Sequence, residues 1–186
     1  RPSGITTIKV YNTGGGGGGG GKYSSIDDKA SAGGAGGTAL EIIDVSSISS
    51  VTVTIGAGGA GGADGDNNGV SGGSSSFGSY CSATGGTFGI ASNQGNKRGG
   101  TGGIGSGGDL NMRGNSGQSM TEASQWAAGR QGGSSFWGGV GIPPGYDDVA
   151  GADSVMGSGG AGGDFVNTAG TATDGGAGIC VVEEYS

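Results

Sequence analysis

The sequence predicts a mostly irregular and β fold, in which extended glycine-rich segments form the core and a small β-sheet forms a base. Glycine fills 53 of the 186 positions, and in several places two glycines and one small residue repeat as a triplet. Apolar residues make up only 31 % of the chain and aromatic residues 6 %, so an ordinary hydrophobic core would be thin. We therefore expect little or no α-helix.

The triplets indicate how glycine could form a packed core. The clearest run, residues 56–63, reads Gly-Ala-Gly-Gly-Ala-Gly-Gly-Ala, and similar runs start at Ala32, Gly99 and Ser158. A period of three is the repeat of the polyproline-II helix, which advances ~3.1 Å per residue without internal hydrogen bonds. Glycine on two of three faces lets neighbouring helices approach closely and exchange backbone hydrogen bonds. We predict an array of polyglycine-II helices, and not collagen, because the chain has only three prolines.

Four segments near the two ends of the chain are rich in β-branched residues, which is typical of strands. We expect the first and last of them to be neighbours, and the middle two to be joined by a short serine-rich turn. The predicted single domain consists of a β base, residues 1–56 plus 178–186, and a polyglycine core with loops, residues 57–177. The four predicted strands are residues 5–11, 40–45, 50–55 and 178–185.

Charge and cysteine content exclude several classes. The net charge of -7 and the pI near 4.2 argue against nucleic acid or an anionic membrane as the main partner. No window approaches the ~18 continuous apolar residues that span a bilayer, so we expect no membrane insertion. Without a signal region or an initiator methionine, the chain is expected to be a C-terminal fragment of a longer protein. Cys81 and Cys180 are too few to staple a scaffold and are predicted to be buried free thiols.

Catalytic and cofactor motifs are weak. Histidine is absent, which removes the commonest general base and zinc ligand, so we expect neither an enzyme nor a cofactor. Residues 16–22 match a phosphate loop, but Tyr23 stands where a Mg²⁺-binding hydroxyl is required. We expect no nucleotide site there.

A second partial motif lies at residues 64–69, which match the first half of a calcium loop. Asp64, Asp66 and Asn68 are its candidate cation ligands. The twelfth position is Ser75 and not the bidentate glutamate, so a polar turn is favoured over a metal site.

Irregular stretches, residues 77–98, 110–130 and 134–155, carry nearly all the large side chains, and only residues 120–128 have helical character. Tryptophan, tyrosine and arginine are enriched at binding hot spots. Surface recognition and plugging of the array ends stay open for Trp126 and Tyr146. Packing is favoured for Phe136 and Trp137, and plugging for Phe77, Tyr80 and Phe88. The candidate binding residues are Lys97, Arg98, Trp126, Arg130, Tyr146, Asp147 and Asp148.

An ordered series of phrases along the whole chain supports a family resemblance. It begins with the strand at 5–10 that leads into the glycine run, and continues through residues 51–59, 74–78, 83–86, 107–114, 132–139 and 181–185. With this series, the chain resembles the glycine-rich C-terminal domain of bacteriophage tail fibres and tail-tip adhesins.

That resemblance implies a receptor-binding role at the distal fibre tip of a virion assembled in the host cytoplasm. In related adhesins, glycine-rich segments build the core and the segments between them contact the bacterial surface. The implied partners are a bacterial outer-membrane protein or surface glycan, and upstream fibre segments. The resemblance is compatible with a homotrimer or with one copy on a trimeric fibre. The loops that would bind are residues 93–98, 118–130 and 141–153.

Two other classes share the composition. One is an ice-binding polyglycine-II protein of the kind found in some arthropods, and the other is a structural glycine-rich protein without a specific ligand. An ice-binding protein needs a flat, regular face of small residues. The long aromatic-bearing stretches of this chain favour the adhesin.

Overall fold

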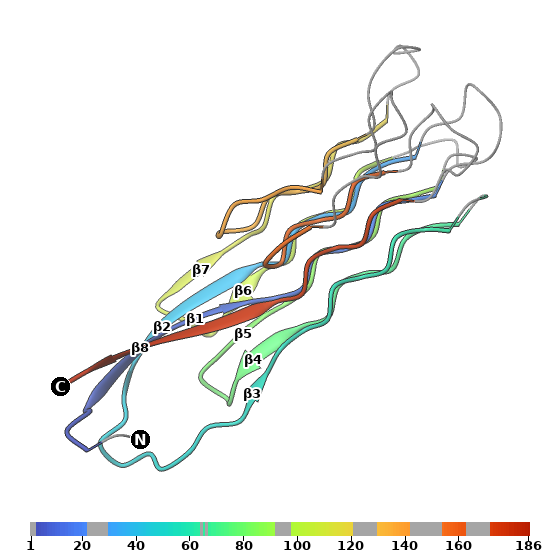
Figure 1. Cartoon of the computed structure of the whole chain (residues 1–186). Coiled ribbons are helices and arrows are strands. Elements are labelled where there is room, and N and C mark those ends of the chain that lie inside the picture. The colour runs from blue at the N-terminus through green and yellow to red at the C-terminus, as the bar shows by residue number, and fades with distance from the viewer. Residues whose placement is uncertain are drawn as a thin grey trace.

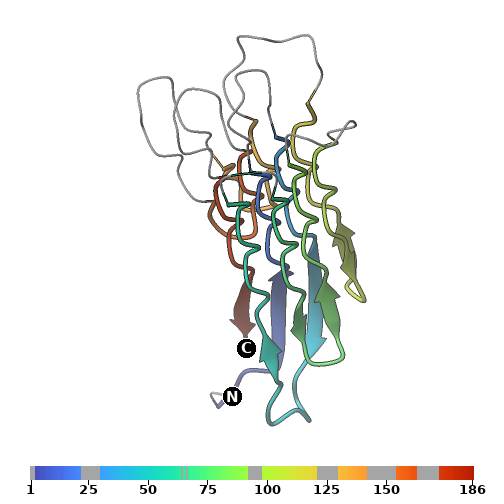
Figure 2. The same ribbon diagram turned by 90° about the vertical axis from the view of Figure 1, so that its right-hand side faces the viewer.

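The computed structural model describes residues 3–21, 30–63, 65, 67–91, 98–120, 130–141, 154–162 and 172–186. Across these residues there are eight β-strands and no helix, and therefore no helix able to cross a membrane. The strands form two four-stranded antiparallel sheets at one end of an elongated body, and extended segments continue from them along its length (Figures 1 and 2).

The first sheet contains both ends of the described chain. Its strand order is β7-β2-β1-β8, and all neighbours are antiparallel. Val10 of β1 lies opposite Glu41 of β2 and Val182 of β8. The prediction that the first and last strands are neighbours is therefore confirmed. The strands are β1 (Thr7–Thr13), β2 (Thr38–Asp44), β7 (Leu110–Met112) and β8 (Ile179–Tyr185).

The second sheet contains shorter strands in the order β3-β4-β5-β6. The third predicted strand, residues 50–55, is reduced to two residues here and pairs with β4. Val45 is buried and Ile48 packs against the core, so the connecting segment crosses between the sheets. The strands are β3 (Val53–Thr54), β4 (Ser75–Phe77), β5 (Cys81–Ala83) and β6 (Gly105–Ser106).

A small hydrophobic core fills the space between the two sheets. Its buried side chains are Ile8, Val10, Ala39, Ile43, Val45, Phe77 and Cys81. Tyr80 packs against this core beside Phe77, with ring centroids 6.4 Å apart. Both rings therefore belong to the core between the sheets. The predicted role for them, plugging of the ends of the glycine array, is wrong. Phe88 is 37 % exposed, so its expected plugging role is also wrong.

Beyond the strands, extended segments run side by side, and we call these segments glycine tracts. The first tract, residues 14–21, continues β1, and each of its eight N–H groups donates to the backbone of another tract. Gly14, Gly17 and Gly20 donate to residues 30–37. The partner tract therefore changes at every residue and returns after three. The intervening glycines donate to residues 67–73 (Gly15, Gly18, Gly21) and to residues 172–178 (Gly16, Gly19).

The carbonyl groups of the same tract accept from three further tracts. Residues 56–63 donate to Gly16 and Gly19, residues 84–91 donate to Gly15 and Gly18, and residues 157–162 donate to Gly17. Six tracts thus surround residues 14–21. A Cβ atom on any of these eight glycines would lie under 3.0 Å from backbone atoms of a neighbour. This crowding is the physical reason for the unbroken glycine run.

Outer tracts need fewer glycines because some of their positions face solvent. In residues 56–63, Ala57, Ala60 and Ala63 are exposed, whereas Gly59 and Gly62 are buried. In residues 113–120 only the two glycines are buried among residues that are otherwise exposed or half-buried. The stretches predicted to be irregular therefore include two ordered tracts, residues 84–91 and 113–120.

Candidate functional site

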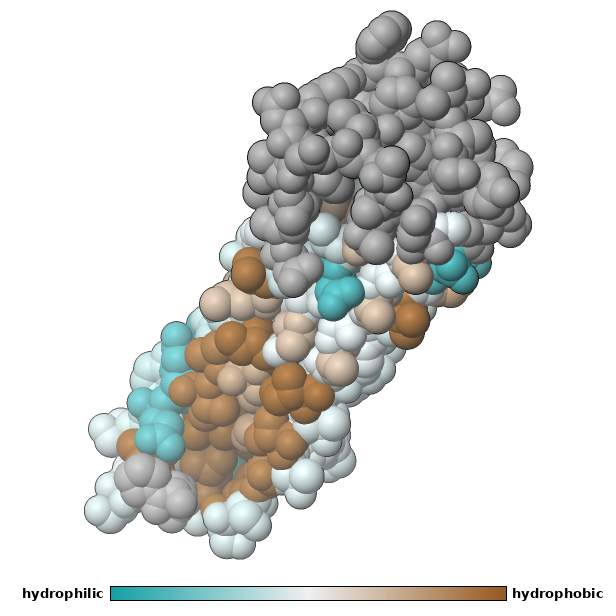
Figure 3. Space-filling view, turned by 45° about the vertical axis from the view of Figure 1, so that its right-hand side comes forward, coloured by the Kyte–Doolittle hydropathy of each residue, from teal (hydrophilic) through white to brown (hydrophobic). Residues whose placement is uncertain are grey.

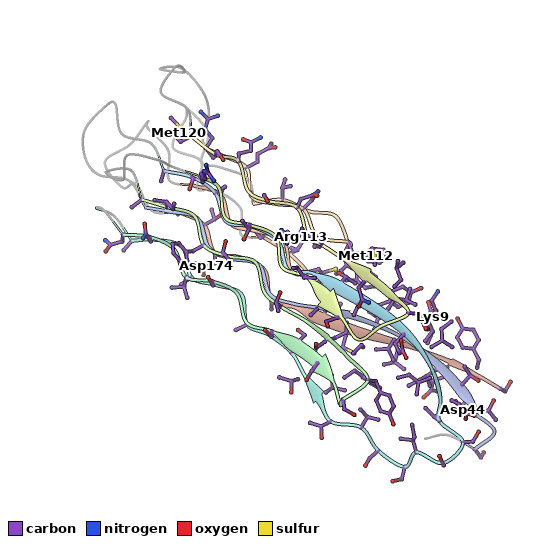
Figure 4. The ribbon with its side chains drawn as sticks, turned by 180° about the vertical axis from the view of Figure 1, so that it is seen from behind. Lys9, Asp44, Met112, Arg113, Met120 and Asp174 are labelled. Carbon is purple, nitrogen blue, oxygen red and sulfur yellow. The ribbon has the colours of Figure 1, made fainter. Side chains whose placement is uncertain are left out.

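Successive tracts alternate in direction. Residues 14–21, 84–91 and 113–120 run away from the strands, and residues 30–37 and 98–105 run back, as their hydrogen-bond registers show. The far end of the body is therefore where outgoing tracts finish and returning tracts begin. Met120, which ends an outgoing tract, lies far from Lys9 and Asp44 of the strand end (Figure 4).

Two of the predicted binding residues, Arg98 and Arg130, lie at this far end. Each begins a returning tract, and both tracts border residues 113–120. Arg98 is exposed, and its carbonyl accepts a hydrogen bond from Ser31 Oγ at 2.8 Å. Arg130 is half-buried, with Nε 3.2 Å from Met120 Sδ, and its carbonyl accepts from Gly162 N at 3.0 Å. The backbone of both arginines is thus fixed by the tracts.

At the same end, small polar side chains accept hydrogen bonds from backbone N–H groups for which no backbone acceptor is found among the described residues. Ser31 Oγ accepts from Ile90 N at 2.7 Å, and Ser119 Oγ accepts from Gly99 N at 3.0 Å. Neither serine is among the binding residues predicted from the sequence. Ser31 has a signal in the sequence, because its tract otherwise contains only glycine and alanine, whereas Ser119 has none, because other polar residues occupy its tract.

The other predicted binding residues lie outside the described residues. They are Lys97, Trp126, Tyr146, Asp147 and Asp148. The segments chosen as binding loops, residues 93–98, 118–130 and 141–153, are described only at their ends. The structure therefore gives the positions from which these segments depart and to which they return.

The two weak motifs have structural roles where they are described. Asn68 Oδ1 accepts a hydrogen bond from Ala91 N at 2.7 Å, so this oxygen joins two tracts. Asp64 and Asp66 lie outside the described residues, and those residues contain no cluster of metal-ligating side chains. In the phosphate-loop match, the N–H groups of residues 16–21 all donate to neighbouring tracts, which leaves none for a phosphate.

An aromatic cluster on the outer face of the first sheet contains Phe136 and Trp137. Trp137 Nε1 donates to Thr13 Oγ1 at 3.0 Å, and its ring lies 5.7 Å from that of Tyr11 and 5.1 Å from that of Phe136. The predicted packing role of the pair agrees with these contacts, although Phe136 stays 47 % exposed. The Lys9 ammonium lies 4.8 Å from the Tyr11 ring centre.

Both cysteines are free thiols, as the sequence analysis expected, and Cys81 is buried while Cys180 is half-buried. Burial raises the pKa of the Cys81 thiol to about 11, with a smaller contribution from Cys180. A thiol with such a pKa stays protonated near neutral pH and is a poor nucleophile. We assign these cysteines to packing.

Comparison with protein-family models shows the family to which the chain belongs. The model of the glycine-rich domain family matches residues 1–185, so the chain belongs to this family. No curated protein matches the sequence.

Proposed function

We propose that this domain is the tip adhesin of a bacteriophage tail fibre, which recognises a receptor on the bacterial surface. The observation that carries the proposal is the anchoring of Arg98, Met120 and Arg130 at one end of a hydrogen-bonded body. A rigid scaffold that fixes both ends of long intervening segments suits them to recognition. The proposed location is the distal tip of the virion's fibre.

We also propose that the tracts are polyglycine-II helices. The support is the three-residue return of hydrogen-bond partners along residues 14–21 and the matching glycine period in residues 56–63. In such helices φ lies near −75° and ψ near +145°. A high-resolution crystal structure with tract dihedrals far from these values would refute this part of the proposal.

The proposed partner is an outer-membrane protein or a surface glycan, bound by residues 93–98, 118–130 and 141–153. These segments contain Lys97, Trp126 and Tyr146, whose side chains suit a binding hot spot. The charge of the chain, -7, suits a partner other than nucleic acid. Upstream fibre segments belong to the same proposal, with the domain present either as a homotrimer or as one copy on a trimeric fibre.

The decisive experiment measures binding of fluorescently labelled domain to a panel of bacterial strains. The double variant Trp126→Ala and Tyr146→Ala should lose binding to the susceptible strain while its melting temperature stays unchanged. Phe88→Ala is the matched control, because it removes an exposed ring from the side of the tract body. Undiminished binding of the double variant would refute the assignment of these two residues, and absence of strain-specific binding by the parent domain would refute the adhesin.

An ice-binding role is the second candidate, because Ala57, Ala60 and Ala63 form a regular exposed row of small residues. Thr87 and Thr101, on two other tracts, carry a pair of exposed hydroxyl groups with Oγ1 atoms 3.2 Å apart. A thermal-hysteresis measurement separates the two functions. Ice binding predicts a hysteresis gap that Ala60→Lys abolishes, whereas the adhesin predicts no gap.

A further inference from the structure

The outer edge of β8 differs from every other long strand edge in the first sheet. β8 pairs with β1 on one side, and among the described residues no strand pairs with it on the other. An unpaired strand edge presents a row of free N–H and C=O groups, which is a template for another strand. Here the edge belongs to a full seven-residue strand.

Hydrogen bonds at the two ends of β8 show which groups face outward. The Tyr185 carbonyl accepts from Thr6 N, on the β1 side, whereas Gly178 N donates to Gly56 O on the opposite side. Residues of an antiparallel strand direct their N–H and C=O groups to alternate sides. The outward groups along the strand are therefore those of Cys180, Val182 and Glu184.

In the ranges that the structure describes, the outer edge of β8 is unpaired because the segment beside it turns away to the other sheet. Gly56, which receives the Gly178 N–H, begins the tract that borders residues 172–178. Its preceding residues, Val53 and Thr54, instead pair with β4 in the second sheet. The segment that lies beside residues 172–178 thus leaves the edge of β8 unpaired.

Exposed apolar side chains occur on β8 and on the segment that turns away from it. Val182 is 41 % exposed, Val53 44 % and Ile55 46 %. Apolar surface gathers over the strand end in Figure 3, whereas the adjoining tract region is paler. Cys180 and Val182 share the face of the sheet that carries Val10, so an added strand would extend the core between the sheets.

Charge distinguishes the occupants that this edge could take. Glu184 is exposed and, within the described part of the chain, has no hydrogen bond or ion pair. Glu183 is adjacent to it, although this residue lies opposite Lys9 and accepts from the Tyr185 hydroxyl at 2.8 Å. A second copy of β8 paired about Val182 would place Cys180 opposite Glu184 and leave the carboxylate without a cation. A basic residue at that place would compensate it.

We propose that the β8 edge is a strand-addition site for an extended segment of another protein. The segment alternates in the usual way across the sheet, is apolar opposite Cys180 and Val182, and has lysine or arginine opposite Glu184. Backbone hydrogen bonds to three outward residues hold it, and the alternate side chains select it.

The test uses a fluorescent seven-residue peptide, Thr-Lys-Lys-Val-Val-Val-Thr, which places lysine opposite Glu184 when it runs antiparallel to β8. Fluorescence anisotropy measures its affinity, and hydrogen exchange followed by NMR measures amide protection. Bound peptide should slow exchange at Cys180, Val182 and Glu184 and leave Val181, already directed at β1, unchanged. A peptide methylated at the three nitrogens that would face β8 should not bind.

Two variants separate the edge from the rest of the fold. Val182→Pro removes an outward N–H without removing a bond to β1, and proline is tolerated at such edge positions. We expect it to weaken peptide binding by roughly tenfold or more, whereas the control Val182→Thr stays within about twofold, since one hydrogen bond and its alignment are lost only in the first. Glu184→Lys should weaken the lysine peptide and strengthen a glutamate counterpart.

The alternatives give distinct results. Equal binding of the methylated peptide, or no added protection of the three amides at millimolar peptide, would overturn the proposal. A dimer of the domain alone in sedimentation experiments, lost in Val182→Pro, would overturn it in favour of self-pairing. If Val182→Pro does not fold, the methylated peptide and Glu184→Lys still decide the matter.

Discussion

The strongest quantitative prediction concerns Gly17→Ala in the first tract, residues 14–21. The Gly17 N–H donates to Gly34 O at 2.9 Å, and its carbonyl accepts from Gly160 N at 2.8 Å, so both peptide groups are fixed. A Cβ here would lie under 3.0 Å from the Thr87 carbonyl group, which is backbone of an adjacent tract. Overpacking of a close-packed interior typically costs about 1–3 kcal/mol, and rigid backbone on all sides places this site at or above about 3 kcal/mol.

Alanine in place of glycine also reduces the entropy of the unfolded chain, which offsets about 0.4–1 kcal/mol where the residue fits. The net loss should therefore be about 2–3 kcal/mol, or a fall in melting temperature of roughly 4–12 °C for a domain of this size. Urea unfolding followed by tryptophan fluorescence, with a check for reversibility, measures it. Ala60→Ser, on an exposed tract face, is the matched control and should stay within about 0.5 kcal/mol. A stability loss below about 1 kcal/mol for Gly17→Ala would refute the close-packing explanation of the glycine run.

Three further predictions concern the junction of strands and tracts. Ser75→Ala removes a buried hydroxyl that accepts from Gly56 N at 2.9 Å, so urea unfolding should show a loss of about 1–3 kcal/mol, while Ser76→Ala on the opposite face should be nearly neutral. Asn12 is buried with neither side-chain amide atom hydrogen-bonded, so Asn12→Leu should leave stability equal or raise it, and a clear loss would show that the amide has a partner. Burial raises the pKa of Cys81 to about 11 from about 8.5 in an unfolded chain, so its contribution to stability is complete below about pH 8.5 and is lost as the pH rises towards 11. The pH dependence of urea unfolding in this alkaline range should be smaller in Cys81→Ala, and equal pH dependence would contradict the assignment.

The strands that could be predicted from the sequence are those whose own residues carry a strand signal. β1, β2 and β8 are rich in β-branched side chains, and the bounds of all three agree with the predicted ranges within two residues. β4 and β7 were missed because serine and asparagine occupy their short ladders, and pairing with distant neighbours decides their conformation. Local propensity therefore predicts the first sheet better than the second.

The tracts show the same distinction between local and distant causes. Residues 14–21 could be recognised because six neighbours exclude every side chain. Residues 113–120 could not, because only Gly114 and Gly117 face inward and the other positions carry ordinary polar residues. For the candidate site, the sequence supplied Arg98 and Arg130 as residue types. The tracts that begin at these two arginines both lie beside residues 113–120. That arrangement depends on how the tracts are ordered in space, which no local sequence pattern encodes.

The three-residue return of hydrogen-bond partners has a consequence for how such a body can change its length in evolution. Loss or gain of three residues within a tract restores every remaining residue to a partner of the same kind, whereas a change of one or two turns each side chain towards the wrong neighbour. Insertions and deletions in the interior should therefore be accepted in multiples of three and matched between adjoining tracts. The unit by which a tract can be lengthened or shortened is thus three residues.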